Sequence, residues 1–239
     1  MHSARKDLTK DLQAQLRRLA EDGSGCVATG SLSLDVLLAG GIRQGALVEW
    51  LGDTGGGATS LALAVARQAC QNGQTLVVID PHRRFYPPAA GNILPMTLVT
   101  YPGNEVDQEW TAIQALRCPA IGAVLWWPER LTERTFRRLQ LAAESGRSLG
   151  LIVRGTSAIR EPSWAEMRLL VRSLPEGARR RFQVEIVRFR GASGRSVEVE
   201  ISSEGLLHDA HPVHSVSELA AATPPQRTSP TQAPRRRRV

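Results

Sequence analysis

Lysine is nearly absent from this chain of 239 residues: only Lys6 and Lys10 occur, and arginine supplies the remaining basic side chains. Long apolar runs are absent too, since no segment approaches the roughly 20 apolar residues that a membrane-spanning helix requires. The N-terminal segment also lacks the apolar stretch of a secretory signal. The lack of a long apolar run and of a secretory signal predicts a protein of the cytoplasm that does not bind membranes.

Cysteine is scarce as well. Cys26, Cys70 and Cys118 stand far apart, and none forms a CxxC pair. This spacing excludes a disulfide framework and a zinc site of the usual kind. We therefore expect the three thiols to be small core residues in a reducing compartment, and we expect neither a metal ion nor a cofactor.

Positive charge is concentrated at the C-terminal end. The net charge is +7, and five arginines but no acids lie between Pro224 and the end of the chain. The segment 209–239 is rich in Pro, Ser, Thr and Ala without an apolar period, so we predict that it is disordered. Its last arginines can contact DNA or a partner protein by charge alone, although a solvated tail that binds nothing is an equal alternative. These residues are Arg235, Arg236, Arg237 and Arg238.

The N-terminal residues 1–24 are predicted to form an amphipathic helix that ends at Gly23. An apolar stripe recurs in it at three- and four-residue spacing, formed by Leu8, Leu12, Leu16 and Leu19. Such a stripe on a terminal helix usually packs on its own domain or on a partner. The chain therefore divides into this helix, a core over residues 25–208 and the basic tail over 209–239.

The first part of the core alternates strands and helices. The predicted strands are 46–51, 75–80, 96–101, 120–127 and 149–154, and the predicted helices are 59–71, 107–116 and 132–145. Continuous apolar strands separated by helices are typical of a parallel sheet with helices on both faces. Beyond Pro162 the pattern changes to alternating strands over 167–174, 181–190 and 195–201, which predicts an antiparallel meander. The fold class is thus α/β, with a mainly parallel sheet and a C-terminal meander.

A degenerate phosphate loop lies between the first strand and the first helix. Gly52 and Gly57 have the spacing of the GxxxxGK[ST] motif, and Thr59 keeps the hydroxyl that binds magnesium. Ala58, however, replaces the lysine that reaches the terminal phosphates. The loop comprises Gly52, Gly55, Gly56, Gly57, Ala58, Thr59 and Ser60.

A second catalytic position is lost at the end of the apolar strand 120–127. In nucleotide-hydrolysing enzymes with this loop, an acidic residue at this place orients magnesium, whereas here the position holds Trp127. We interpret the glycine loop chiefly as a tight turn from strand to helix. Retained nucleotide binding is the alternative, because backbone amides at a helix N-terminus can hold an anion.

The segment 29–52 (TGSLSLDVLLAGGIRQGALVEWLG) resembles the start of the core of RecA-family recombinases in order and spacing. This resemblance implies a RecA-like phosphate-loop core. It also implies a catalytic glutamate shortly after Asp80, and His82 stands near that position. By this comparison the catalytic positions at Ala58, His82 and Trp127 are all lost, so no catalytic residue is assigned. The loops with which recombinases hold single-stranded DNA have little room here.

A narrower resemblance is to the ImuA family, the RecA-like accessory proteins of bacterial SOS mutagenesis. It rests on VIDPHRRFYPPA (78–89), GAVLWWPERL (122–131), RRLQLAAESG (137–146) and FQVEIVRFRG (182–191). The family implies a non-polymerase role in error-prone translesion synthesis. Its expected partners are an ImuB-type protein that resembles Y-family polymerases and an error-prone DNA polymerase III alpha subunit. RecA, or a second copy joined through the N-terminal helix, is a further candidate partner.

Two clusters of arginine are candidate contacts for DNA or an acidic partner. We expect the first to lie on one arc of a helix over 129–145, opposite Phe136, Leu139 and Ala143. A solvated face of a core-packed helix is the plainer interpretation. The second cluster opens a meander strand. The residues are Arg130, Arg134, Arg137 and Arg138 in the first cluster, and Arg179, Arg180 and Arg181 in the second.

Four functions fit these patterns to different degrees. The first is a non-catalytic adaptor in damage-tolerant DNA synthesis and repair. The second is a DNA-stimulated ATPase with an unusual site, against which the missing lysine and acids argue. The third is an SOS-type inhibitor of cell division, since such inhibitors share a decayed RecA-like core. The fourth is a DNA-binding module with residual nucleotide binding.

Overall fold

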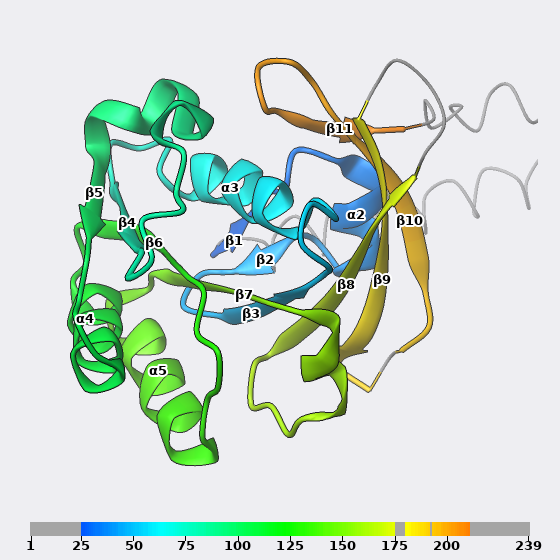
Figure 1. Cartoon of the computed structure of the whole chain (residues 1–239). Coiled ribbons are helices and arrows are strands. Elements are labelled where there is room, and N and C mark those ends of the chain that lie inside the picture. Colours follow the sequence, from blue (N-terminus) through cyan, green and yellow to red (C-terminus); the bar gives the residue numbers. More distant parts are fainter. Residues whose placement is uncertain (1–24, 175–179, 192, 211–239) are drawn as a thin grey trace, which may run out of the picture.

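The computed structural model describes residues 25–174, 180–191 and 193–210. Within them, a nine-stranded sheet has the strand order β11-β10-β9-β8-β3-β7-β6-β4-β5 (Figure 1). The predicted N-terminal helix with its leucine stripe, Arg179 and the four arginines of the tail lie outside the described residues.

Six neighbouring strands of this sheet are parallel. Continuous apolar segments predict five of them, whereas the sixth, over 167–174, was predicted as part of the antiparallel meander. They are β3 (Leu47–Leu51), β4 (Thr75–Ile79), β5 (Thr97–Thr100), β6 (Ile121–Trp126), β7 (Leu149–Arg154) and β8 (Met167–Leu174). Strands β3, β6 and β7 are buried over their whole length, which explains why most of their residues on both faces are apolar. The strand predictions for this region are confirmed to within about two residues.

Helices cover both faces of the parallel sheet, as predicted. Helix α3 (Ala58–Ala69) packs on one face against alternate strand residues such as Trp50 and Val78. Helices α4 (Glu105–Arg117) and α5 (Glu133–Gly146) pack side by side on the other face, against the intervening residues such as Val77 and Val124 (Figure 1). Each strand therefore serves two cores, one on each face.

The antiparallel meander is also confirmed. Strand β9 (Arg180–Phe189) pairs with β8 and with β10 (Ser196–Ile201), and β11 (Leu207–Asp209) continues the sheet. The sequence did not predict β11. Asp209, at its end, accepts hydrogen bonds from Ser31 Oγ at 2.5 Å and from the Ser33 amide at 3.0 Å. The last strand is thereby tied to the N-cap of the short helix α2 (Leu32–Leu37).

Several short elements were not predicted. Strands β1 (Cys26–Val27) and β2 (Ile42–Arg43) pair with each other, and two 3₁₀ segments, η1 (Pro87–Met96) and η2 (Thr156–Arg160), follow β4 and β7. Arg67 of α3 lies beneath η1 and donates to the carbonyls of Ala89 and Ala90 at 2.8 and 3.1 Å. Elements this short carry too few residues for a periodic apolar signal.

Two predictions about individual residues are wrong. Cys118 is exposed and Cys26 is half-buried, so of the three thiols only Cys70 is a core residue, and burial raises its pKa to about 11. Arg130 is not part of the helical arc, because α5 begins only at Glu133, after an N-cap at Thr132. The Thr132 hydroxyl accepts from the Thr135 amide at 3.2 Å and so places the start of the helix there. Among the described residues, no helix combines the length and apolar character needed to cross a bilayer.

Candidate functional site

A cavity of about 540 Å³ opens at the carboxyl ends of strands β3, β4, β6 and β7. Each of these strands leads directly into a segment that lines the cavity. The segments begin at Gly52, Asp80, Trp127 and Gly155, and Arg180 at the start of β9 closes another side. Ligand sites in parallel α/β sheets form at this edge, and the volume lies within the range of small-molecule pockets.

The degenerate phosphate loop keeps its turn from strand to helix. Gly57 is the N-cap of α3 and has φ 97°, a left-handed conformation that favours glycine. A methyl group at this position would come within 2.1 Å of the Phe182 ring, because β9 packs directly against the loop. Glycine at position 57 is therefore required both by its backbone angle and by this close approach.

The start of α3 presents backbone donors to the cavity. No side chain caps the helix at Gly57. The first backbone hydrogen bond of the helix is donated by the Leu61 amide to the Gly57 carbonyl at 3.0 Å. The amides before it, at Ala58, Thr59 and Ser60, have no acceptor among the described residues. Uncapped amides at a helix N-terminus carry partial positive charge and form a site that attracts anions.

Ala58 is buried at the base of the loop, 4% exposed. Its methyl group lies so close to Gly52 that a Cβ at residue 52 would stand 3.0 Å from it. The position that carries a cationic chain in working phosphate loops is thus part of the packing here. The chain has no lysine beyond Lys10, so none can come from elsewhere in the described core.

Trp127 directly follows the last residue of β6, where the sequence placed the missing acidic residue. Its indole Nε1 donates a hydrogen bond to Thr59 Oγ1 at 3.2 Å. An indole offers a donor and no lone pair to a metal ion, so this residue cannot orient magnesium. The Thr59 hydroxyl, which would ligate magnesium in a working site, is thereby hydrogen-bonded to a side chain that cannot bind the metal.

The segment after β4 forms a different wall of the cavity. The Asp80 carboxylate is buried and accepts hydrogen bonds from the amides of Arg84 and Phe85 at 3.0 and 2.8 Å. Its role is to fix the turn that follows the strand. His82, at the expected glutamate position, is exposed and lines the cavity.

Arg180 lines the cavity, although the sequence predicted it to lie on a surface patch. The sequence grouped it with a surface cluster for DNA or a partner, but its guanidinium Nη2 lies 3.2 Å from Ser60 Oγ, in the cavity. The neighbouring Arg181 instead pairs with Glu198 of β10 at 2.6 Å. The alternation of the strand separates these two arginines, since adjacent side chains point to opposite faces.

Comparison with known proteins identifies sequences and a structure that this chain resembles. The chain is 37% identical to RecA of Rhodopirellula baltica over 83 residues, which are 33% of this chain and 22% of that protein. It is 43% identical to RecA of Deinococcus radiodurans over 82 residues, which are 33% of this chain and 23% of that protein. The chain thus matches about a fifth of the length of these relatives. No protein-family model matches it.

The crystal structure of the RadB recombinase superimposes with a TM-score of 0.60 at 18% identity, over 77% of this chain and all of that one. The fold is RecA-like. Sequence similarity to RecA over a third of the chain agrees with that assignment.

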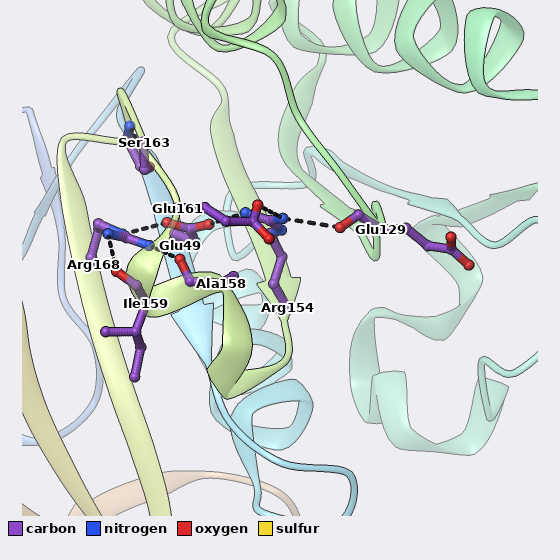
Figure 2. A network of polar contacts seen from close by, with 9 residues as sticks. Glu49, Glu129, Arg154, Ala158, Ile159, Glu161, Ser163 and Arg168 are labelled. Atoms are coloured by element: carbon purple, nitrogen blue, oxygen red, sulfur yellow. Dashed lines mark hydrogen bonds and ion pairs between the residues drawn. The ribbon is translucent and has the colours of Figure 1, made fainter.

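Beside the phosphate loop, the RecA-like core buries a cluster of charges (Figure 2). Glu49 of β3 is fully buried. Its Oε1 accepts from Arg154 Nη1 at 3.1 Å and its Oε2 from Arg168 Nε at 2.6 Å. The two arginines come from β7 and β8, the strands on either side of β3, so one carboxylate links three strands.

The remaining N–H donors of these two guanidinium groups hold the segment that follows β7. Arg168 donates to the carbonyls of Ala158 and Ile159 at 2.6 and 3.2 Å. Arg154 donates to Glu161 Oε2 at 2.5 Å and to the Glu129 carbonyl at 2.9 Å. The cluster therefore fixes the cavity wall formed by η2. The sequence contained a signal for it, since Glu49 and Arg168 are charged residues within largely apolar strands and Arg154 ends another.

The other predicted arginine contacts lie on the surface, three of them on helix α5. Arg134 and Arg137 are exposed on α5, and Arg130 is exposed in the segment before it. Arg138 forms an ion pair with Glu109 of α4 and so joins the two helices. Phe136, Leu139 and Ala143 are buried on the opposite side of α5, as predicted.

Proposed function

We propose that this chain is a non-hydrolysing RecA-like accessory protein of the ImuA type, acting in error-prone translesion DNA synthesis. The observation that carries the proposal is the hydrogen bond from Trp127 to Thr59, together with alanine at position 58. The loop keeps the shape of a phosphate loop while the two groups that handle phosphate charge and magnesium are replaced.

The chemistry of phosphoryl transfer explains why these replacements matter. Hydrolysis of a nucleoside triphosphate depends on positioning and on neutralising the charge of the transferred group, chiefly by a lysine and a magnesium ion. Ala58 supplies no charge, Trp127 supplies no metal ligand, and His82 stands where the resemblance to recombinases expects a glutamate. A RecA-like core without these groups is suited to binding rather than turnover.

The proposed partners follow from the resemblance to ImuA. They are an ImuB-type protein similar to Y-family polymerases and an error-prone DNA polymerase III alpha subunit. Residues 1–24, with their leucine stripe, are the proposed contact. RecA or a second copy of this chain are further candidates for the same contact, and the basic tail is a candidate contact for DNA.

The test is a pull-down of the full-length chain from cells treated with a DNA-damaging agent. We expect recovery of the Y-family-like protein or of the polymerase subunit. The variant Leu12→Glu/Leu16→Glu disrupts the predicted stripe, and Gln13→Glu/Ala14→Glu is its matched control because it adds two negative charges away from the stripe. The proposal predicts that recovery is lost in the first variant and retained in the second.

Other outcomes would contradict the proposal. Recovery of cell-division proteins alone, with filamentous growth on overexpression, would favour the division inhibitor. Recovery of DNA alone would leave a DNA-binding module. Equal recovery with both variants would move the partner contact away from the N-terminal segment.

A further inference from the structure

Helices α4 and α5 expose three large apolar side chains on the side that faces away from the sheet. On α4, Val106 and Trp110 are 76% and 62% exposed, and on α5 Leu141 is 57% exposed. Val106 and Trp110 are four residues apart and are therefore neighbours on the helix surface. Single exposed apolar residues are ordinary, whereas a group of them in one place marks an interaction site.

These side chains border the seam between the two helices. The helices pack side by side (Figure 1), and Arg138 of α5 forms an ion pair with Glu109 of α4 across the seam. Trp110 directly follows Glu109, and Leu141 lies one turn after Arg138. Because the opposite sides of both helices are buried against the sheet, the exposed side chains lie on the outer side of the seam. We call Val106, Trp110 and Leu141 the outer seam.

Two arginines flank the outer seam. Arg134 and Arg137 are exposed on α5, seven and four residues before Leu141, and so share its side of the helix. Unlike Arg138, neither forms an ion pair with a carboxylate of the described residues. Tryptophan and arginine are the side chains most enriched among the hot spots of protein interfaces. An apolar centre bordered by charged groups is also the usual composition of such an interface.

The charge of this face argues against DNA as its partner. Helices α4 and α5 together carry five acidic residues and four arginines, a net charge of −1. Surfaces that bind DNA instead concentrate positive charge, which displaces counterions from the phosphates. The exposed indole and leucine side chains would also remain in water beside a phosphate backbone. A protein partner can cover both the apolar side chains and the arginines.

We propose that the outer seam binds an amphipathic helix of a partner protein, with apolar side chains on Trp110 and Leu141 and acidic side chains opposite Arg134 and Arg137. Rows of side chains on packed helices leave grooves into which a third helix fits, and an amphipathic helix offers apolar anchors at three- and four-residue spacing. The unpaired arginines require acidic residues beside those anchors. This contact lies on the core, whereas the proposed accessory role uses residues 1–24, so neither proposal depends on the other.

The segments of this chain outside the described core do not have the required charge. Residues 1–24 carry the leucine stripe, but they contain five basic and four acidic residues, and Arg17 and Arg18 lie between two leucines of the stripe. Residues 211–239 contain five arginines and a single acid. Either segment would bring like charges toward the exposed arginines of α5. The proposed occupant is therefore a separate protein.

The experiment places the photoreactive amino acid p-benzoylphenylalanine at Gln114 of the full-length chain in its host cells. Gln114 is exposed one turn after Trp110, so the outer seam stays intact. We expect irradiation to link the chain to a protein. Mass spectrometry of the linked segment should show apolar residues at helical spacing with acids beside them. The same amino acid at Arg195, which is exposed outside α4 and α5, is the control and should give no such product.

A tryptophan variant tests the apolar part of the contact. We expect Trp110→Ala to lower the yield of the linked product about tenfold, the effect of losing an interface hot spot. Trp164→Ala is the matched control, because Trp164 is 47% exposed and lies outside both helices. Its yield should be unchanged. Thermal unfolding of both variants checks that the core remains folded.

A charge reversal tests the acidic part of the contact. We expect Arg134→Glu/Arg137→Glu to lower the yield about tenfold as well, because like charges then face each other across the interface. Arg160→Glu/Arg195→Glu is the matched control. It changes the net charge by the same amount at two exposed arginines away from α4 and α5, and it should leave the yield unchanged.

Several results would overturn the proposal. They are no product beyond that of the Arg195 probe, a product with DNA or with a second copy of this chain, a linked segment without acids, and equal losses in the variants and their matched controls. A product with an acidic amphipathic segment of some protein other than the expected polymerase partners would support the outer seam while counting against the accessory role. The two proposals can therefore fail separately.

Discussion

Strand β3 and the loop that follows it carry two polar sites, separated by only two residues. The sites differ in how completely their hydrogen-bonding groups are paired within the protein. At Glu49 both carboxylate oxygens are bonded to arginines, and the site is closed from solvent. At Gly52 the chain enters a loop whose amides and nearby guanidinium face a cavity. The first site is therefore a structural charge cluster, whereas the second has unpaired donors beside an open cavity.

Electrostatics explains why the closed site has to be complete. Burying a charge costs several kcal/mol, and good geometry with additional hydrogen bonds is needed to offset that cost. Glu49 and its two arginines meet this condition nearly in full. The donors of the phosphate loop border a cavity that water can enter, so leaving them without a protein acceptor costs little.

The largest expected effect is at the closed site. Replacing Glu49 by Gln keeps the shape of the side chain but leaves the buried Arg168 without its counter-charge and Arg154 with only the partly exposed Glu161. We expect this change to lower the free energy of unfolding by about 3–5 kcal/mol, measured by urea denaturation. Glu161→Gln is the control, because its side chain is 41% exposed and its loss should cost about 1 kcal/mol or less. Similar losses in both variants would contradict a closed cluster.

The next effect concerns the shape of the loop. Gly57→Ala places a methyl group against Phe182 in a left-handed conformation, and we expect a loss of about 2–4 kcal/mol in unfolding free energy. Gly55 also has a positive φ, of 80°, but a methyl group there would meet open space. Gly55→Ala should therefore cost only about 1–2 kcal/mol. Equal stability of the two variants would show that β9 does not pack on the loop.

The smallest effect is at the boundary between loop and strand. Trp127→Phe removes the hydrogen bond to Thr59 while keeping an aromatic ring. We expect a loss of about 0.5–1.5 kcal/mol, seen as a modest decrease of the urea midpoint. No gain of ATP hydrolysis should accompany it, since the variant still lacks both lysine and acid. Turnover in this variant would show that the indole alone had blocked the site.

The sequence predicted the parallel sheet well because its strands are buried on both faces and are therefore continuously apolar. It also located the phosphate loop, since that motif is local in the chain. It failed where contacts join distant segments. Arg180 lies 120 residues from Ser60, and no local pattern shows that β9 returns to the loop. Likewise, β11 has only three residues, too few for a periodic signal.

We propose that this RecA-like core does not hydrolyse nucleotide. The most direct measurement is ATP turnover by the purified full-length chain with magnesium and single-stranded DNA. We expect no turnover above that of a Thr59→Ala variant. Turnover that depends on DNA and is abolished by Thr59→Ala would contradict it, because that result would mean that the loop hydrolyses ATP despite Ala58 and Trp127.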